Sequence, residues 1–155
     1  MLEPSYIAGF MDGDGSISLS KHKNRTTVKR YSYVVECQIA QRFSLNAQTL
    51  LKNIAQQYDG AYFEHTTKAT TYSNGHLRHI CKVTISSSKA IRFLQDITPF
   101  LRLKAQQAQI ALRFQLRRDK IGVYNRWNLK PKEAWQLDGA DYQMMKVLNR
   151  KNVRR

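Results

Sequence analysis

The chain has 155 residues, 42% of them hydrophobic, which is enough to bury the core of one domain. Lys and Arg number 26 against 11 Asp and Glu, and the net charge of +15 favours a polyanionic partner, foremost nucleic acid. The two cysteines lack zinc-ligand spacing, the first residues lack a secretory signal, and no segment is long enough to span a membrane, so we expect an intracellular protein.

The first part of the chain predicts a helix followed by two strands. The helix is expected over residues 4–12, where Gly13 and Gly15 end it. Residues 16–24 alternate apolar with polar side chains, which is typical of a half-buried strand. Residues 29–41 show the same alternation over a longer run, so a second strand is expected there.

The rest of the chain predicts a second helix and strand pair, followed by helices. These elements are a helix over 46–58, strands over 61–68 and 77–85, a helix over 88–97 that Pro99 ends, a helix over 101–116, a loop over 119–132, and a last helix over 133–150 interrupted near Asp138 and Gly139. The order αββαββα predicts an α+β fold with helices on one face of an antiparallel sheet. We expect one domain over 1–155, with a C-terminal helical region at about 119–155.

The sequence Asp-Gly-Asp-Gly at residues 12–15 ends the first predicted helix. The last turn of a helix carries a partial negative charge, so Asp12 and Asp14 are unfavourable there unless a cation binds. A hard divalent cation such as Mg²⁺ prefers these oxygen ligands. The same four residues could simply end the helix and form a turn, and taken alone they favour that alternative. A calcium loop is excluded because its later ligands are absent.

Two small residues, Ala8 and Gly9, lie within the same predicted helix. Glycine in a helix costs roughly 1 kcal/mol relative to alanine, and close approach of another helix would offset that cost. Two copies of the helix that met across a twofold axis would bring their carboxylates together and strengthen the demand for cations. We therefore expect Ala8, Gly9 and Asp12 at an interface between two copies.

Residues 6–16, YIAGFMDGDGS, closely resemble the LAGLIDADG motif. From residue 4 to about 116 the chain is similar to the single-motif, homodimeric branch of the LAGLIDADG homing endonucleases, including the segment TPFLRLK at 98–104. The resemblance implies a four-stranded antiparallel saddle that binds the major groove of DNA, with helices packed on its opposite face.

The resemblance also assigns catalytic roles to residues of this chain. Asp14 would bind the metal together with the backbone carbonyl of Gly13, and Asp12 ranks second as a metal ligand. Gln41 would position the water, although it could be an ordinary polar residue at a strand end. Lys104 would stabilise the transition state, although it could be a solvated helix charge. Mg²⁺ is the implied cofactor, with Mn²⁺ as a substitute.

The outward faces of the strands are expected to read base edges. These residues are Ser18, Ser20, His22, Asn24, Arg30, Ser32, Glu36, Gln38, Glu64, Thr66, Arg78, Lys82 and Thr84. A shift of one residue in the register of the later strand pair would exchange its two faces. Phosphate contacts are expected from Lys21, Lys23, Arg25, Lys29, Arg113, Arg117, Arg118 and Lys120. A strand of about nine residues spans about 30 Å, so a dimer would cover roughly 18–20 base pairs.

The resemblance implies a homodimeric, site-specific homing endonuclease that makes a metal-dependent double-strand break in a pseudo-palindromic DNA site and leaves short 3′ overhangs. Its gene would belong to an intron or another mobile element, with the host intron RNA as a further candidate partner. The alternatives are a catalytically silent or dual-role RNA-splicing maturase, a DNA-binding regulator of the same fold, and a generic basic RNA-binding protein. The presence of Asp14, Gln41 and Lys104 favours the nuclease.

Overall fold

The computed structural model describes residues 1–23, 31–68, 77–121 and 132–152. Its elements are α1 (Pro4–Asp14), β1 (Gly15–Lys23), β2 (Tyr31–Arg42), α2 (Leu45–Gln57), β3 (Ala61–Lys68), β4 (Leu77–Ser86), α3 (Lys89–Ile97), the 3-10 turn η1 (Thr98–Phe100), α4 (Ala105–Ile121) and α5 (Lys132–Asn152). This order confirms the predicted α+β class. None of the helices in the described ranges combines the length and the apolarity that a membrane crossing requires.

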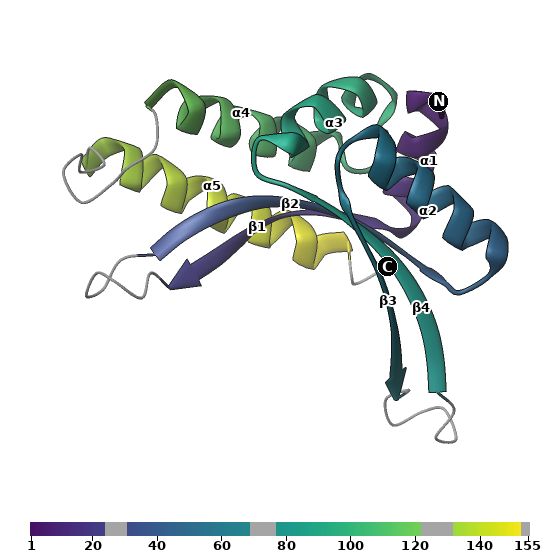
Figure 1. The fold of residues 1–155 in the computed structure, drawn as a ribbon. Coiled ribbons are helices and arrows are strands. Elements are labelled where there is room, and N and C mark those ends of the chain that lie inside the picture. The colour runs from purple at the N-terminus through teal and green to yellow at the C-terminus, as the bar shows by residue number, and fades with distance from the viewer. Residues whose placement is uncertain (24–30, 69–76, 122–131, 153–155) are drawn as a thin grey trace.

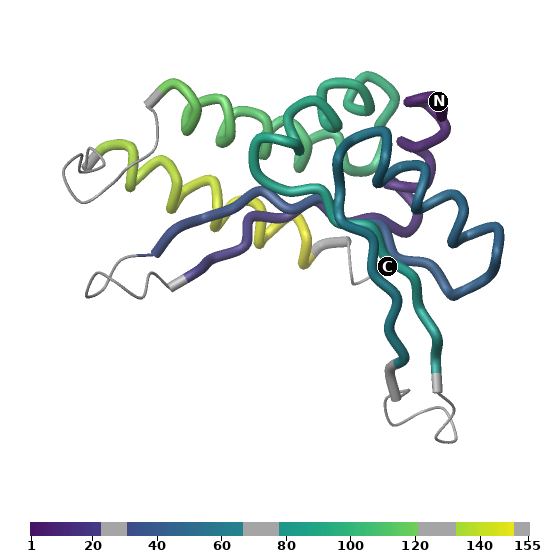
Figure 2. Tube along the Cα trace, viewed as in Figure 1, coloured from purple at the N-terminus to yellow at the C-terminus, as the bar shows by residue number. Residues whose placement is uncertain are grey.

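The four strands form one antiparallel sheet in the order β1-β2-β4-β3. Helices α1 to α4 lie on one side of the sheet, and the hairpins β1–β2 and β3–β4 diverge below them (Figure 1). The trace in Figure 2 shows that the two hairpins form an arch. The face of the sheet turned away from the helices is here called the open face. It is the face whose polar side chains are predicted to contact a partner.

The alternation of apolar residues along the strands builds the core. Successive side chains of a strand point to opposite faces, so every second residue of each strand meets the helices. The strand residues buried in this way are Ile17, Leu19, Val35, Cys37, Ile39, Cys81, Val83 and Ile85. Ile7 and Met11 of α1 and Phe93 of α3 are fully buried against them. One face of the sheet is therefore sealed, and the other keeps its polar side chains for contact.

Helix α4 begins and ends later than the sequence predicts. The prediction of a helix from residue 101 is wrong for its first turn, because Leu101 is extended (φ −68°, ψ 137°) and the helix begins at Ala105. The helix continues to Ile121, so residues 119–121 are helical rather than loop-like. The rest of the expected loop up to residue 131 lies outside the described residues.

Helix α5 is continuous, and the predicted interruption near Asp138 and Gly139 is wrong. Arg117 of α4 donates to Asp138 Oδ1 over 2.6 Å and to Asp141 Oδ2 over 2.8 Å, and Arg113 also bonds Asp141. The side chains of Asp138 and Asp141 are only 2% and 5% exposed. Asp138 and Asp141 are three residues apart and lie on the same face of the helix. Because both are bound to α4, the helix continues through Gly139.

Alanine at position 15 should destabilise the protein, because the helix-to-strand junction leaves no room for a Cβ atom. That atom would lie 2.8 Å from both the Cα and the carbonyl oxygen of Met11, so the backbone would have to shift. We expect Gly15→Ala to lower the free energy of unfolding by about 1–3 kcal/mol in urea titrations. Gly139→Ala is the control: its Cβ meets nothing within 4 Å, and alanine should raise helix stability by about 0.5–1 kcal/mol. Equal effects of the two changes would contradict the steric account.

Candidate active site and nucleic-acid interface

The candidate site lies where α1 ends and β1 begins. The chain leaves the helix at Gly15, which is extended (φ −91°, ψ 169°) and donates its N–H to the carbonyl of Met11. The last carbonyl groups of a helix have no intrahelical partner, so the carbonyls that follow Met11 are available for other contacts. Asp14 is exposed at this end, in the negative field of the helix terminus. Backbone and side-chain oxygens therefore gather at one point on the surface.

Gln41 holds the carboxylate of Asp14. It lies near the end of β2, whose pairing with β1 sets Gly15 opposite Ile39 and brings Gln41 close to the end of α1. The Gln41 Nε2 atom donates to Asp14 Oδ2 over 2.6 Å. A carboxylate has further acceptor positions beyond this one bond. The second oxygen of Asp14 is therefore available to a metal ion or a water molecule.

Asp12 caps the segment that precedes α4. Its carboxylate accepts hydrogen bonds from the backbone N–H groups of Arg102 (2.6 Å), Leu103 (3.2 Å) and Lys104 (3.0 Å). These bonds satisfy amides that would otherwise lack partners before the helix begins. Asp12 was predicted as an interface residue and as a second-rank metal ligand. Its carboxylate is instead occupied within its own chain.

The Lys104 side chain also contacts the end of α1. Its Nζ atom donates to the backbone carbonyl of Asp12. Partial burial lowers the pKa of Lys104 from its ordinary value, and the nearby carboxylates of Asp12 and Asp14 oppose that shift. The structure thus brings together the three residues predicted to be catalytic, Asp14, Gln41 and Lys104, from three separate parts of the chain.

The oxygen ligands of this cluster are of the type that a hard divalent cation binds, but they are too few to complete its coordination shell. The Asp14 carboxylate and the Gly13 carbonyl are oxygen ligands of the type that Mg²⁺ prefers. Within the described ranges, no three acidic, histidine or cysteine side chains gather into a metal-binding group. One chain therefore offers part of a coordination shell, and the remaining oxygens would come from water, a phosphate or a second copy.

The outer face of α1 is open, although not at every residue predicted for it. Ala8 is fully buried in the core, so its assignment to an interface between copies is wrong. The helical turn places Ala8 on the same side as Ile7 and Met11, facing the sheet. Gly9 is exposed, and a Cβ atom there or at Gly13 would meet nothing within 4 Å. The exposed face of α1 therefore carries two glycines, Gly9 and Gly13, at which another molecule could approach the backbone closely.

The register of the sheet fixes which residues lie on the open face, because directly opposite residues of antiparallel strands share a face. Ser18, Ser20, His22, Ser32, Glu36, Gln38, Lys82, Thr84 and Arg78 lie there as predicted. Phe63, His65 and Ile80 lie there too, and the polar pattern of the prediction missed them. Asn24 and Arg30, also predicted for this face, lie outside the described residues.

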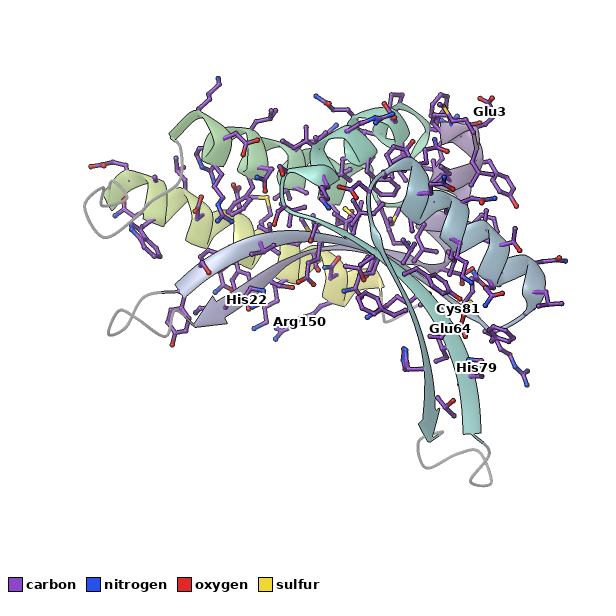
Figure 3. All side chains as sticks on the ribbon, viewed as in Figure 1. Glu3, His22, Glu64, His79, Cys81 and Arg150 are labelled. Atoms are coloured by element: carbon purple, nitrogen blue, oxygen red, sulfur yellow. The ribbon has the colours of Figure 1, made fainter. Side chains whose placement is uncertain are left out.

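Glu64 and Thr66 lie on the other face, so their prediction as outward residues is wrong. Glu64 is opposite Cys81 and Thr66 is opposite His79, on the side that meets the helices. Glu64 accepts from Gln48 of α2 over 2.6 Å and lies 3.5 Å from His79. Glu64, His79 and Cys81 gather near the base of this hairpin (Figure 3). The register is offset by one residue from the one the alternation suggested.

Hydrogen bonds from Tyr62 and Gln48 keep the pKa of Glu64 below its ordinary value. Burial and the bond to Glu64 raise the pKa of Tyr62 to about 12. Tyr62 therefore stays protonated as a donor at neutral pH, and Glu64 stays ionised as its acceptor. This network ties β3 to α2 and gives Glu64 a structural place rather than an outward one.

The three arginines of α4 are bound within the chain, whereas Lys120, at the end of the helix, is exposed. Arg113 and Arg117 pair with the acids of α5, and Arg118 donates to the backbone carbonyl of Tyr33. Their expected role as phosphate contacts is therefore not supported by their positions. The Lys21 ammonium lies 3.9 Å from the ring centre of Tyr31, on the helix side of β1. Of the basic residues predicted for phosphates, Lys23, Arg25 and Lys29 have no described side chains.

Comparisons with known proteins agree with the geometry. The sequence model of a family described as LAGLIDADG endonuclease matches residues 7–101. A comparison with curated proteins found no matching sequence.

Several solved structures share the fold. The homing endonuclease I-CvuI, solved in complex with its target in the presence of Ca, is 17% identical, with a TM-score of 0.67 over 94% of this chain and 80% of that one. The homing endonuclease I-TnaI is 15% identical, with a TM-score of 0.57 over 97% of each chain. The meganuclease I-SmaMI, bound to uncleaveable DNA, is 16% identical, with a TM-score of 0.59 over 94% of this chain and 42% of that one. At these identities the likeness establishes the fold.

Proposed function

The chain belongs to the LAGLIDADG endonuclease family, and we propose that it is a homing endonuclease that cuts both strands of a long, specific DNA site. The observation that carries the proposal is the meeting of Asp14, Gln41 and Lys104 at the end of α1, where the chain passes into the sheet. A plain helix stop would need none of these contacts. A purely DNA-binding protein of this fold would have no use for a half-buried lysine beside two carboxylates.

The Asp14 carboxylate and the Gly13 carbonyl would hold Mg²⁺, with Mn²⁺ as a substitute. The bound metal would lower the pKa of a water molecule and stabilise the charge that develops on the scissile phosphate. Gln41 fixes the orientation of the Asp14 carboxylate through the 2.6 Å bond, and its amide oxygen would be left to position the attacking water. Lys104 supplies a positive charge where the phosphate becomes more negative.

The proposal includes a homodimer in which two copies meet through α1. One chain carries one motif and one exposed catalytic acid, which accounts for the cleavage of one strand. Pairing across a twofold axis would bring two Asp14 carboxylates together and complete the oxygen shell that one chain leaves open. Two open faces would then cover roughly 18–20 base pairs of pseudo-palindromic DNA, and the two cuts would leave short 3′ overhangs.

Glutamate at position 9 should separate the two copies. Because a Cβ atom at Gly9 meets nothing within 4 Å, Gly9→Glu should fold normally, while two like charges at a twofold axis would repel. We expect sedimentation at micromolar concentration to show a dimer for the wild type and a monomer for the variant. Asn53→Glu, on the exposed surface of α2, is the matched control and should stay dimeric. A wild-type monomer, or a dimeric Gly9→Glu variant, would overturn the α1 interface.

The lowered pKa of Lys104 predicts how cleavage depends on pH. The ammonium is charged below its pKa and loses that charge as the pH rises through it, so the loss begins below the ordinary value of 10.5. We expect the single-turnover cleavage rate to fall on this alkaline limb, while DNA binding changes less. Arginine keeps its charge at any such pH, so Lys104→Arg should flatten the limb. An unchanged limb in that variant would show that another group titrates.

The direct test of the proposed function is cleavage of a randomised duplex DNA library in the presence of Mg²⁺, followed by sequencing of the ends. We expect a recurrent, imperfectly twofold site cut on both strands with short 3′ overhangs, and no cutting when EDTA removes the metal. Specific binding without cutting at any metal concentration would indicate a silent relative of the fold. Cutting without sequence preference would refute the homing assignment.

A further inference from the structure

Glu36 is the one acidic side chain on the open face among the described residues of the sheet. It lies on the central strand β2, between Ser18 of β1 and Ser86 of β4. The chain as a whole carries a net charge of +15, and its proposed partner is a polyanion. A carboxylate at the centre of that surface opposes the phosphates unless it meets a hydrogen-bond donor. Its position therefore calls for a specific partner.

Two neighbours fix the orientation of this carboxylate. Gln38 Nε2 donates to Glu36 Oε2 over 3.3 Å, and His22 Nε2 lies 3.8 Å from Glu36 Oε1. The Glu36 side chain is 23% exposed, so most of its surface is covered and its rotation is restricted. An ionised carboxylate has about four acceptor positions, so these contacts leave acceptors directed towards a ligand.

Gln38 adds an acceptor of its own to this pair. A glutamine that approaches a base freely can donate and accept at once, which suits adenine. Here the amide nitrogen is directed at Glu36, so the amide oxygen becomes the group available for another partner. Glu36 and Gln38 together present acceptors to whatever lies over the centre of the sheet.

The base edges of the major groove offer few matching donors. Guanine shows two acceptors and thymine shows an acceptor and a methyl group, so both are mismatched to a pair of acceptors. Adenine offers its N6 amino group but sets the N7 acceptor beside it. Cytosine offers its N4 amino group and no acceptor. A fixed carboxylate therefore selects cytosine over the other three bases.

We infer that Glu36, held by Gln38, is a specificity-determining residue that recognises a cytosine at the base pair over the centre of each sheet. The inference rests on the proposed DNA-cleaving function, because it assigns a base preference to the surface that this function uses. The serines on both sides, Ser18 and Ser86, are short enough to let the base edge approach the carboxylate.

The test is a binding selection on a randomised duplex library in Ca²⁺ buffer, with the wild type, Glu36→Gln and Asp59→Asn run in parallel. Removing an acid raises the net charge by one and strengthens all DNA binding, so a matched control is needed. Asp59→Asn makes the same charge change at the exposed turn between α2 and β3, where the carboxylate pairs with Lys89 of α3. Asparagine tolerates the positive φ of 52° at this position, and the exposed pair with Lys89 contributes little.

The wild type and Asp59→Asn should both select a cytosine at one position of each half-site. Glu36→Gln should reduce that preference by about tenfold or more, with adenine gaining, while the other positions keep their preferences. Selection of a site by the wild type with no position altered in Glu36→Gln would overturn this inference alone. An altered position at which the wild type does not select cytosine would overturn it as well. No enriched sequence for the wild type would overturn the proposed function along with it.

Discussion

Asparagine in place of Asp14 is expected to abolish double-strand cleavage and leave DNA affinity nearly unchanged. The amide has the shape of the carboxylate and can still accept the hydrogen bond from Gln41, so the end of α1 should keep its fold. It lacks the negative charge that a divalent cation requires, and the cleavage rate should fall by at least about a thousandfold. Single-turnover cleavage and equilibrium binding, both on the site recovered from the library, measure the two effects separately.

Asp59→Asn serves as the control for this change, because it removes the same charge from an exposed turn whose carboxylate pairs with Lys89, and it should cut at the wild-type rate. Cleavage by Asp14→Asn at a similar rate would show that Asp14 is not the metal ligand. Loss of binding together with cleavage would instead assign Asp14 to the architecture of the DNA-binding surface.

Methionine in place of Arg117 is expected to cost more stability than any other single change considered. It would leave Asp138 without the guanidinium 2.6 Å away and Asp141 without the one 2.8 Å away, with both carboxylates almost fully buried. Breaking a buried pair by removing one partner costs about 3–5 kcal/mol, because the charge of the guanidinium no longer offsets the burial of the two carboxylates. Chemical unfolding should show that loss, with α5 separating from α4.

Arg113→Met is the matched control for the ion-pair network. The Arg113 side chain is 57% exposed, and among the described residues its ion pair is with Asp141 alone, so its removal should cost much less. A third variant, Arg117→Met with both aspartates replaced by leucine, should recover much of the lost stability, because apolar packing can substitute for a buried ion pair. Equal losses in the two single variants would mean that burial does not set the strength of these pairs.

The paired strands near the amino end were predictable because each has one apolar face. Ile17, Val35 and Cys37 alternate with polar neighbours, so the buried face follows from period two alone. In β3 the two aromatic residues Tyr62 and Phe63 are adjacent, and alternation cannot say which of them faces the helices. The pairing with β4 decides it, and the assignments of Glu64 and Thr66 failed for that reason.

The boundaries of the late helices depend on partners that are far away in sequence. The amides of residues 102–104 donate to the carboxylate of Asp12, about ninety residues earlier. The local sequence around residue 102 does not predict this cap. Gly139 is normally a signal that weakens a helix, yet the charge pairs of its neighbours hold α5 together across it. Local propensity was overridden by tertiary contacts in both cases.

The catalytic residues were assigned by resemblance rather than from their own spacing. Asp14, Gln41 and Lys104 are separated by tens of residues, and no periodicity links them. Their meeting requires the β1–β2 register and the turn before α4, both of which arise only in the folded chain. The exposed side of α1 is a similar case. Both small residues were visible in the sequence, but only the folded chain shows that Gly9 is exposed and Ala8 is buried.

The hydrogen bonds of Asp12 tie the segment before α4, and with it Lys104, to the end of the first helix. The Asp12 carboxylate binds three amides and the Asp12 carbonyl binds the lysine amine, so Lys104 moves wherever the end of α1 moves. In the proposed dimer, sliding or tilting of one α1 against the other would thus alter the separation of the two sites and leave the arrangement inside each unchanged. Variation at the helix contact could then adjust the stagger between the two cuts while each half keeps its chemistry.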